Sequence, residues 1–508
     1  MKSESRGGES DRGGMNRMST RSSEIRTRLN HPIIDSDGHW AELFPVLFEF
    51  VEEVAGSAVL ERFRAGYGQR FHGWYSADAE TRRRGRMRRP SYWGVPTGKD
   101  RIASLIPSVF RDSLDSWGID VAVVYPSIGL TLARDVSDRE LINGVIRAYN
   151  VMVAELFAPH SDRVIPVGVV SLADPSDAIA QLEHAHSLGL RQVVTGGSVV
   201  RTVEADAEWQ PDPTKRRVYV DGLGLDSPHD YDPVWEKFTE LKIPVTTHSG
   251  SMGWPDRSSP TNFVANHLGH FAQSHHLFAR SLLLGGVTQR FPDLRFGFLE
   301  GGVGWACSLL ADLKEHWEKR NRKALEVNLK PTNFDRAEFR KHLESYAETE
   351  ERFAGKTEDI LEKNLDQLEC DITQEALADR DRDSDDFALV KIGNKDELRR
   401  LFRKNFYFGC EADDPMTAVA FDPRMKMHLK PVLGSDISHF DVVDASGVVG
   451  EAYGLVEAGL LTGENFRDFT FSNAVGLFAG MNPDFFKGTI VEDEVARELE
   501  ALRAKEVA

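Results

Sequence analysis

The sequence Ile33-Ile34-Asp35-Ser36-Asp37-Gly38-His39 is a short apolar run that ends in two carboxylates and an imidazole. In an extended chain alternate side chains share a face, so Asp37 and His39 are expected to point the same way as Asp35. A carboxylate and an imidazole in this arrangement suit one divalent ion. The alternative is a strand end followed by a polar turn, because Asp and Gly are common turn residues.

Downstream, short β-branched runs alternate with longer segments of helical period, which is typical of βα units in a parallel sheet. Seven further strands are predicted, at residues 120–125, 164–170, 191–195, 243–248, 295–300, 405–409 and 431–436. With the opening run they predict a (β/α)8 barrel, whose catalytic groups lie at the C-terminal ends of the strands. An open doubly wound sheet is the alternative fold, although no Gly-rich phosphate turn follows the first strand.

Several predicted strands end on a side chain that can bind a metal. His248 ends the fifth strand, Glu300 the sixth and Asp436 the eighth. Since these ends meet at one face of a barrel, we expect them to share one site with Asp37 and His39. Each has an ordinary alternative: His248 as a hydrogen-bonded core histidine, Asp436 as a helix N-cap, and Glu300 as the start of a glycine-rich turn.

Composition narrows the class of protein. The chain has 508 residues, with 62 Lys plus Arg against 80 Asp plus Glu and a formal charge of -18. This balance disfavours a nucleic-acid partner, whose phosphates need a basic surface. Three scattered cysteines indicate a reducing compartment. No run approaches the roughly 20 apolar residues of a membrane span. The sequence therefore predicts a cytoplasmic protein with a small-molecule substrate and no membrane or nucleic-acid partner.

The chain is expected to divide into three segments. Residues 1–30 are rich in Ser, Gly and Arg and predict a disordered tail. Residues 31–488 form the barrel, with a charged helical insertion at about 320–400 between strands six and seven. The insertion is expected to form a lid or a subunit contact, which leaves a homo-oligomer open. Residues 489–508 predict a charged C-terminal helix.

Residues 41–100 contain two patterns. Residues 41–60 carry apolar positions at helical spacing and predict a helix. The arginine-rich residues 61–100 predict a solvated loop, in which Arg70 is a candidate to face a ligand. A basic loop beside a metal site would receive an anionic substrate.

Four further residues are candidates for substrate binding. His267 and His270 are three apart and would share a helix face, although the alternative is a polar helix surface. His439 follows Asp436 by three residues. Trp305 suggests an apolar pocket near the site, or ordinary core packing.

These strand ends resemble the amidohydrolase superfamily, and within it the group that includes aminocarboxymuconate semialdehyde decarboxylase and the resorcylate decarboxylases. The resemblance covers roughly residues 31–485. The matching motifs are Ile34-Asp35-Ser36-Asp37-Gly38-His39, Thr247-His248-Ser249-Gly250, Gly285-Gly286-Val287, Arg290-Phe291-Pro292-Asp293-Leu294-Arg295, Gly434-Ser435-Asp436-Ile437-Ser438-His439 and the late Asn473.

The resemblance implies one divalent metal held by a pair of histidines on strand one, a histidine on strand five and an aspartate on strand eight. His39, His248 and Asp436 match that set. Asp37 replaces the first histidine, and this oxygen ligand shifts the preference from zinc toward manganese or iron. Glu300 replaces the sixth-strand histidine that commonly handles protons in the decarboxylases of this group.

Together these features predict a metal-dependent hydrolase of an amide, ester, thioester or activated carbon-carbon bond in a small organic acid. Its cofactor would be one Zn, Mn or Fe ion, which lowers the pKa of a bound water to about 7. Asp436 would move the proton, and Glu300 is a second candidate acid or base. One alternative is a non-oxidative decarboxylase of an aromatic or enoic acid. The other is an inactive binding barrel, suggested by Asp37 and Glu300.

Overall fold

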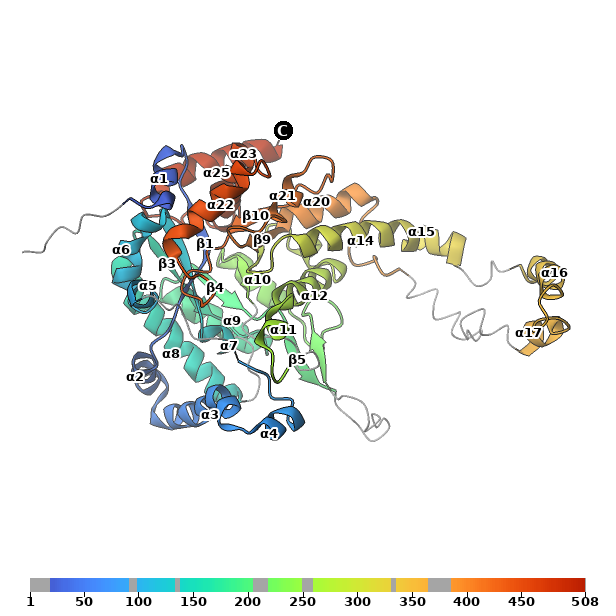
Figure 1. Ribbon diagram of the computed structural model, residues 1–508, viewed down its shortest axis with the longest axis horizontal. Coiled ribbons are helices and arrows are strands. Elements are labelled where there is room, and N and C mark those ends of the chain that lie inside the picture. Colours follow the sequence, from blue (N-terminus) through green and yellow to red (C-terminus); the bar gives the residue numbers. More distant parts are fainter. Residues whose placement is uncertain are drawn as a thin grey trace, which may run out of the picture.

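The computed structural model describes residues 19–90, 98–132, 138–203, 218–248, 259–329, 335–363 and 385–507. Its centre is a sheet of eight strands in which every neighbouring pair is parallel. In spatial order they are β1 (Ile34–Trp40), β2 (Val121–Pro126), β3 (Val164–Val169), β4 (Gln192–Thr195), β7 (Val245–Thr247), β8 (Phe296–Phe298), β9 (Phe406–Cys410) and β10 (Pro431–Leu433). The predicted (β/α)8 barrel is confirmed, and Figure 1 shows the helices around its strands.

The segment after β10 closes the barrel against β1. The Asp436 N–H donates a hydrogen bond to the carbonyl of Asp37 at 3.0 Å. The His39 N–H donates to the carbonyl of Ile437 at 2.9 Å. These two bonds continue the backbone pairing beyond the last strand, so the polar ends of the first and last strands meet.

Helices cover the outside of the strands, which explains why β2 and β9 are buried at every residue. The covering helices include α8 (Arg139–Phe157), α9 (Pro175–Ser187), α10 (Asp232–Glu240), α12 (His270–Leu284), α14 (Gly304–Arg320), α20 (Lys395–Asn405) and α24 (Asn473–Phe478). Of the described helices, only the stretch Arg139–His160 is long and apolar enough to cross a membrane by length and composition. Half of that stretch is buried, and α8 buries nine residues in the fold, as a core helix does.

The prediction of a solvated loop at residues 61–100 was wrong, because much of this segment is helical. Helix α3 (Ser57–Ser76) and helix α4 (Ala79–Arg84) occupy it, followed by α5 (Gly98–Ala103). The Asp78 side chain caps α4 by accepting a hydrogen bond from the Thr81 N–H at 2.7 Å. Arginine is itself a good helix former, so a run of arginines does not argue against a helix.

The single helix predicted over residues 41–60 is divided in two. Gly56, with a φ of 88°, separates α2 (Phe44–Ala55) from α3. A left-handed backbone of this kind suits glycine, which has no Cβ, and ends the first helix.

Part of the predicted disordered tail is ordered. Helix α1 (Arg21–Arg28) begins at a capping box on Thr20 and buries Ile25. The Ser22 hydroxyl donates to the carbonyl of Ser446 at 2.6 Å, next to α22 (Val448–Glu457). The buried Ile25, the Ser22 hydrogen bond and the Arg26–Asp120 ion pair dock this short helix, and the composition of residues 1–30 does not reveal these contacts. Residues 1–18 lie outside the described chain.

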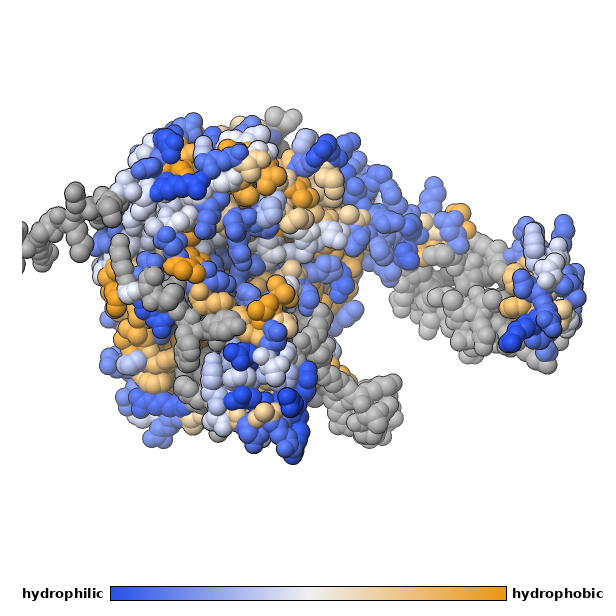
Figure 2. Space-filling view, viewed as in Figure 1, coloured by the Kyte–Doolittle hydropathy of each residue, from blue (hydrophilic) through white to orange (hydrophobic). Residues whose placement is uncertain are grey.

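The sequence between β8 and β9 contains several helices beyond α14. They are α15 (Arg322–Ala324), the π-helical turn η2 (Leu325–Leu329), α16 (Arg336–Ala347) and α17 (Thr357–Lys363). Figure 1 shows α16 and α17 away from the barrel, and Figure 2 shows that they are mostly hydrophilic. Residues 364–384 of the predicted insertion lie outside the described residues. At the C-terminus, α25 (Glu492–Val507) occupies the segment that was predicted to be helical.

An antiparallel pair of strands that the sequence reasoning missed lies between β4 and β7. It consists of β5 (Val199–Thr202) and β6 (Val218–Asp221). Both runs are rich in β-branched or aromatic residues, which is the signal that was available.

Candidate metal centre

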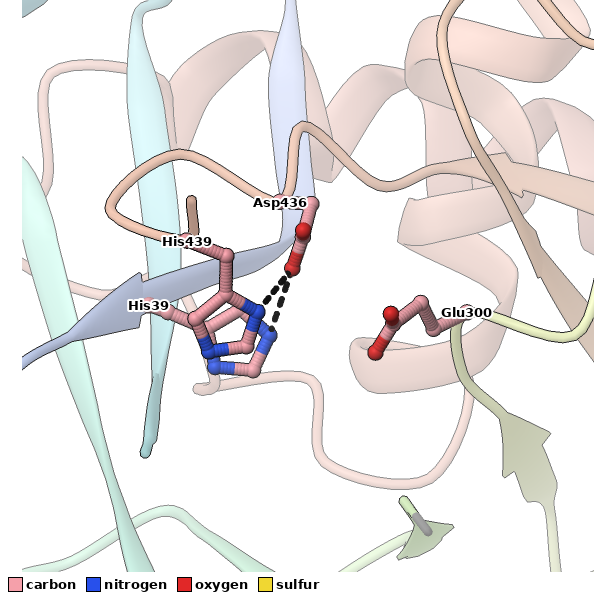
Figure 3. A group of neighbouring side chains, drawn as sticks. All are labelled: His39, Glu300, Asp436 and His439. Carbon is pink, nitrogen blue, oxygen red and sulfur yellow. Dashed lines mark ion pairs between the residues drawn. The ribbon is translucent and has the colours of Figure 1, made fainter. Parts of the chain in front are cut away.

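Six side chains with metal-binding atoms gather at the C-terminal ends of the strands, in two groups that share His39. The groups are Asp37, His39 and His248, and His39, Glu300, Asp436 and His439. Within each group the ligand atoms lie within 4.8 Å of one another. Figure 3 shows the second group, with both imidazoles directed at Asp436 and Glu300 facing them from the other side. The structure therefore brings together the five residues predicted to form the centre and adds His439.

His39 on β1 presents a lone pair to two carboxylates. Its Nδ1 lies 3.2 Å from the carbonyl of Pro126, which makes Nδ1 the protonated nitrogen and leaves Nε2 as an acceptor. Nε2 lies 3.5 Å from Asp37 Oδ1 and 3.3 Å from Asp436 Oδ1. Burial, with the charges of His439 and His248, lowers the pKa of His39 well below its usual value. His39 Nε2 and the two carboxylate oxygens are therefore three hydrogen-bond acceptors that face one another with no donor among them.

The buried atoms at this point fit a cation. Within the described residues, Asp37 Oδ1 and His39 Nε2 are buried and have no hydrogen-bond partner. Unsatisfied buried polar atoms are costly, and a bound divalent ion would satisfy both. Burial first, and then repulsion by Glu300, raise the pKa of Asp37 and of Asp436 well above the usual range. Such carboxylates are stabilised in their ionised form by a neighbouring cation.

Asp35 joins β1, which carries Asp37, to the segment after β10, which carries Asp436. Its carboxylate accepts hydrogen bonds from the Ser435 N–H at 3.0 Å and the Ser435 hydroxyl at 2.6 Å. It also accepts from the Asp37 N–H at 3.2 Å. A Cβ at Gly38 would lie 2.5 Å from Asp35 Oδ2, so this position needs glycine. Asp35 is thus a positioning residue and belongs to neither group of possible ligands, since the register of β1 shifts between Asp35 and Gly38.

Glu300 pairs with the two predicted histidines on its side of the centre. His248 Nε2 lies 2.8 Å from Glu300 Oε2, and His267 Nε2 lies 3.8 Å from Glu300 Oε1. Burial raises the pKa of Glu300 to about 7, although His439 and His267 act in the opposite direction. Glu300 therefore lies between His248 and His267.

Two of the carboxylates are held by strained backbone. Glu300 has a φ of 57° and Asp436 a φ of 49°, both in the left-handed region. Such a conformation costs about 1–3 kcal/mol in a residue other than glycine and occurs often at functional sites. At these positions the turn directs each carboxylate into the centre as its strand ends.

His439 is fixed from three directions. Its ring stacks on His39 with the centroids 3.8 Å apart, and its Nδ1 lies 2.5 Å from Asp436 Oδ1. Its Nε2 lies 3.2 Å from the hydroxyl of Ser127. The buried Glu42 carboxylate accepts from the Ser127 N–H at 3.1 Å and so holds that loop. The sequence reasoning missed Ser127 and Glu42, because only the fold brings the end of β2 next to His439.

Three other residues were predicted to bind substrate, and neither group of possible ligands includes them: His270, Trp305 and Arg70. His270 is buried beside Phe271 and is not in either ligand group. Trp305 packs against Phe298 and Phe408, each with ring centroids 5.5 Å apart. Trp305 also lines a cavity with His276 and Arg280, so its contact with a substrate stays a prediction. The Arg70 side chain lies outside the described residues.

Aromatic rings line one side of the centre. Phe271 lies 5.4 Å from both His248 and His267, measured between ring centroids. Phe440, one residue after His439, lies 5.3 Å from Phe263. A described cavity of about 700 Å³ lies elsewhere, among residues such as Arg139, Asn143 and Tyr219.

Part of the sequence matches a known protein family. A family described as amidohydrolase matches residues 122–346, a range that includes His248 and Glu300 but neither β1 nor the segment after β10. No curated protein matches the sequence.

Solved structures of low sequence identity also match the chain. An amidohydrolase from Mycobacterium avium subsp. paratuberculosis K-10 has a TM-score of 0.49 and 16% identity, over 89% of this chain and 100% of that one. The 2,6-dihydroxybenzoate decarboxylase from Rhizobium has a TM-score of 0.45 and 14% identity, over 88% and 98%. A 5-carboxyvanillate decarboxylase from Novosphingobium aromaticivorans, solved with manganese, has a TM-score of 0.47 and 12% identity, over 88% and 97%. The match over residues 122–346 confirms the resemblance predicted from the strand ends: this chain is similar to the amidohydrolases.

Proposed function

We propose that the protein is a metal-dependent hydrolase with one divalent cation bound by Asp37, His39, His248 and Asp436. The observation that carries this proposal is the pair of buried acceptors, Asp37 Oδ1 and His39 Nε2, that face each other 3.5 Å apart without a described hydrogen-bond donor. Two carboxylates and two imidazoles suit Zn, Mn or Fe.

The chain supplies the proton transfer and the orientation. When bound, the ion would polarise a carbonyl group and increase the acidity of water. Asp436 accepts the proton of the attacking water and returns it to the leaving group. The contact of 2.5 Å between His439 Nδ1 and Asp436 Oδ1 keeps that carboxylate in one orientation. Glu300 orients His248, because its Oε2 lies 2.8 Å from His248 Nε2.

A carboxy-lyase acting on an aromatic acid is the second candidate. The rings of Phe271, Phe263 and Phe440 favour a flat apolar group in the substrate, which such an acid would have. In this alternative the same residues would bind an acid and stabilise the charge that develops as carbon dioxide leaves.

One series of assays distinguishes hydrolysis from decarboxylation. The metal-loaded protein is offered aryl esters, thioesters and amides, and separately hydroxylated benzoic acids, with detection of released acid or carbon dioxide. The proposal expects turnover of an acyl compound that disappears after chelation and in His248→Ala. His316→Ala, on the exposed part of α14, is the matched control and should retain activity. Metal-dependent release of carbon dioxide without acyl hydrolysis would replace the hydrolase proposal with the lyase.

A further inference from the structure

A buried carboxylate that belongs to neither group of possible ligands lies just after β1. Glu42 follows His39 by three residues and is 4% exposed. Its Oε1 accepts hydrogen bonds from the N–H groups of Ser127 and Gly129, both at 3.1 Å. Its Oε2 accepts from the Ile128 N–H at 2.8 Å and from the Ser127 N–H at 3.3 Å. Glu42 therefore holds three consecutive backbone N–H groups, and two oxygens that both accept hydrogen bonds fit an ionised carboxylate.

The segment that Glu42 holds consists of residues 126–129 and is called the β2 turn below. It joins the end of β2 to α7 (Gly129–Leu132). Gly129 is buried, and a Cβ at this position would lie 2.6 Å from Pro126 Cβ and 3.0 Å from Val169 Cγ2. The β2 turn is therefore held through its backbone by Glu42 and is closely packed around Gly129.

Two imidazoles of the centre contact the β2 turn. The carbonyl of Pro126 lies 3.2 Å from His39 Nδ1, and the hydroxyl of Ser127 lies 3.2 Å from His439 Nε2. The two rings stack with their centroids 3.8 Å apart, and Figure 3 shows each with one nitrogen directed at Asp436. Each ring thus contacts the β2 turn through one nitrogen and faces Asp436 through the other.

We infer that Glu42 is a positioning residue for the metal centre, which fixes the orientation of His39 and His439 together through the β2 turn. This inference rests on the proposed metal centre and goes beyond it by naming a group outside the ligand set on which the centre depends. Hydrogen-bond partners of a metal-binding histidine influence metal affinity because they fix the orientation of its ring. Displacing the β2 turn should therefore weaken metal binding although every ligand is still present.

Two substitutions disturb the β2 turn in different ways. Glu42→Gln removes the charge and brings an amide NH₂ group against backbone N–H donors, which leaves buried donors unsatisfied. Gly129→Ala adds a Cβ that presses on Pro126 and changes no charge. Zinc affinity of the full-length protein is measured by chelator competition at pH 8, well below the melting temperature of each variant. Each substitution should lower this affinity at least about tenfold.

Matched substitutions control for charge and for added volume. Glu498→Gln removes the charge of another buried carboxylate, which pairs with Arg467. Gly454→Ala adds a Cβ that meets no atom within 4 Å. Both variants should retain the wild-type zinc affinity. Because all proteins are compared in their folded state, a purely stabilising role of Glu42 would leave the affinity unchanged.

The joint orientation of the two rings is tested without metal. Proton–carbon NMR of chelated protein with isotope-labelled histidines follows the ring resonances, which are assigned with His39→Gln and His439→Gln. Glu42→Gln and Gly129→Ala should shift the resonances of both rings, because each ring is stacked on the other. His31 is buried before the start of β1 and should keep its resonance.

Three results would overturn the inference. They are wild-type zinc affinity in Glu42→Gln and Gly129→Ala, a loss of affinity in Glu42→Gln alone, which would assign the effect to charge, and NMR shifts that miss His39 and His439 or extend equally to His31. If one variant does not fold, the other is compared with its own control. A wild-type protein that binds no zinc would identify a failure of the proposed metal centre, and the NMR comparison would then decide the role of Glu42.

Discussion

Asp436 is positioned by the chain before any ligand arrives. Its N–H donates to the carbonyl of Asp37 at 3.0 Å, and its Oδ1 lies 2.5 Å from His439 Nδ1 and 3.3 Å from His39 Nε2. Together with its left-handed backbone, these contacts restrict the carboxylate to one orientation. Preorganisation of this kind suits the proton transfer that we propose for Asp436.

The substitution Asp436→Asn removes the charge of the carboxylate and keeps the size of the side chain. Asparagine tolerates the left-handed backbone, so the melting temperature of the metal-free protein should stay close to that of the wild type. Without the charge, metal affinity should fall at least about tenfold and turnover about 10²- to 10⁴-fold. Chelator competition and steady-state kinetics measure the two effects, with Asp293→Asn as the matched control. Unchanged affinity and turnover would remove Asp436 from the centre.

Asp35 should give the metal-free protein a distinctive pH dependence. Burial raises its pKa to about 6 although hydrogen bonds from Ser435 oppose the shift. Between about pH 4 and 6 the folded chain then binds more protons at Asp35 than the unfolded chain, so stability falls as pH rises. Relative to Asp35→Asn, the wild type should lose up to about 3 kcal/mol of unfolding free energy over this range, measured by urea denaturation with chelator. A constant or rising difference would contradict the assignment.

At the scale of elements, the junction of β1 with the segment after β10 determines the geometry of the centre. Two backbone hydrogen bonds and the Asp35–Ser435 contacts join it, and Asp37, His39 and Asp436 all depend on it. Disturbing this junction should therefore affect stability and metal binding together.

Gly38→Ala tests that coupling. The new Cβ would lie 2.5 Å from Asp35 Oδ2 and should cost about 1–3 kcal/mol of unfolding free energy while weakening metal binding. Gly454→Ala, in α22, meets no atom within 4 Å and should be neutral or stabilising by up to about 1 kcal/mol. Chemical denaturation and chelator competition report the two properties. Normal metal binding in a destabilised Gly38→Ala protein would show that the junction does not shape the centre.

Helix α1 should contribute to stability even though its composition predicts disorder. Ile25 is 3% exposed, and Ile25→Ala should cost about 2–5 kcal/mol. Ile490 is 53% exposed, so the same substitution there should change stability by less than about 0.5 kcal/mol. Equal melting temperatures for the two variants would show that α1 does not dock.

Over the whole molecule, the elements that follow from a local hydrophobic pattern could be predicted from the sequence. Contacts between residues that are far apart in the sequence could not. The strands, and the ligand candidates His248, Glu300 and Asp436 at their ends, follow from short runs that can be recognised in isolation. Ser127 and Glu42 carry no such signal, because their partners arrive through the fold. The helices over residues 61–100 were missed since an arginine-rich composition is compatible with both loop and helix.

The central claim is that Asp37, His39, His248 and Asp436 form one divalent metal site. Its most direct test is the metal content of the purified protein by mass spectrometry, after incubation with Zn, Mn or Fe(II) and gel filtration. The claim predicts about one ion per chain in the wild type and in His316→Ala, and a content near zero in Asp37→Ala and His248→Ala. A wild-type protein that retains no ion, or a His248→Ala protein that retains as much as the wild type, would contradict it.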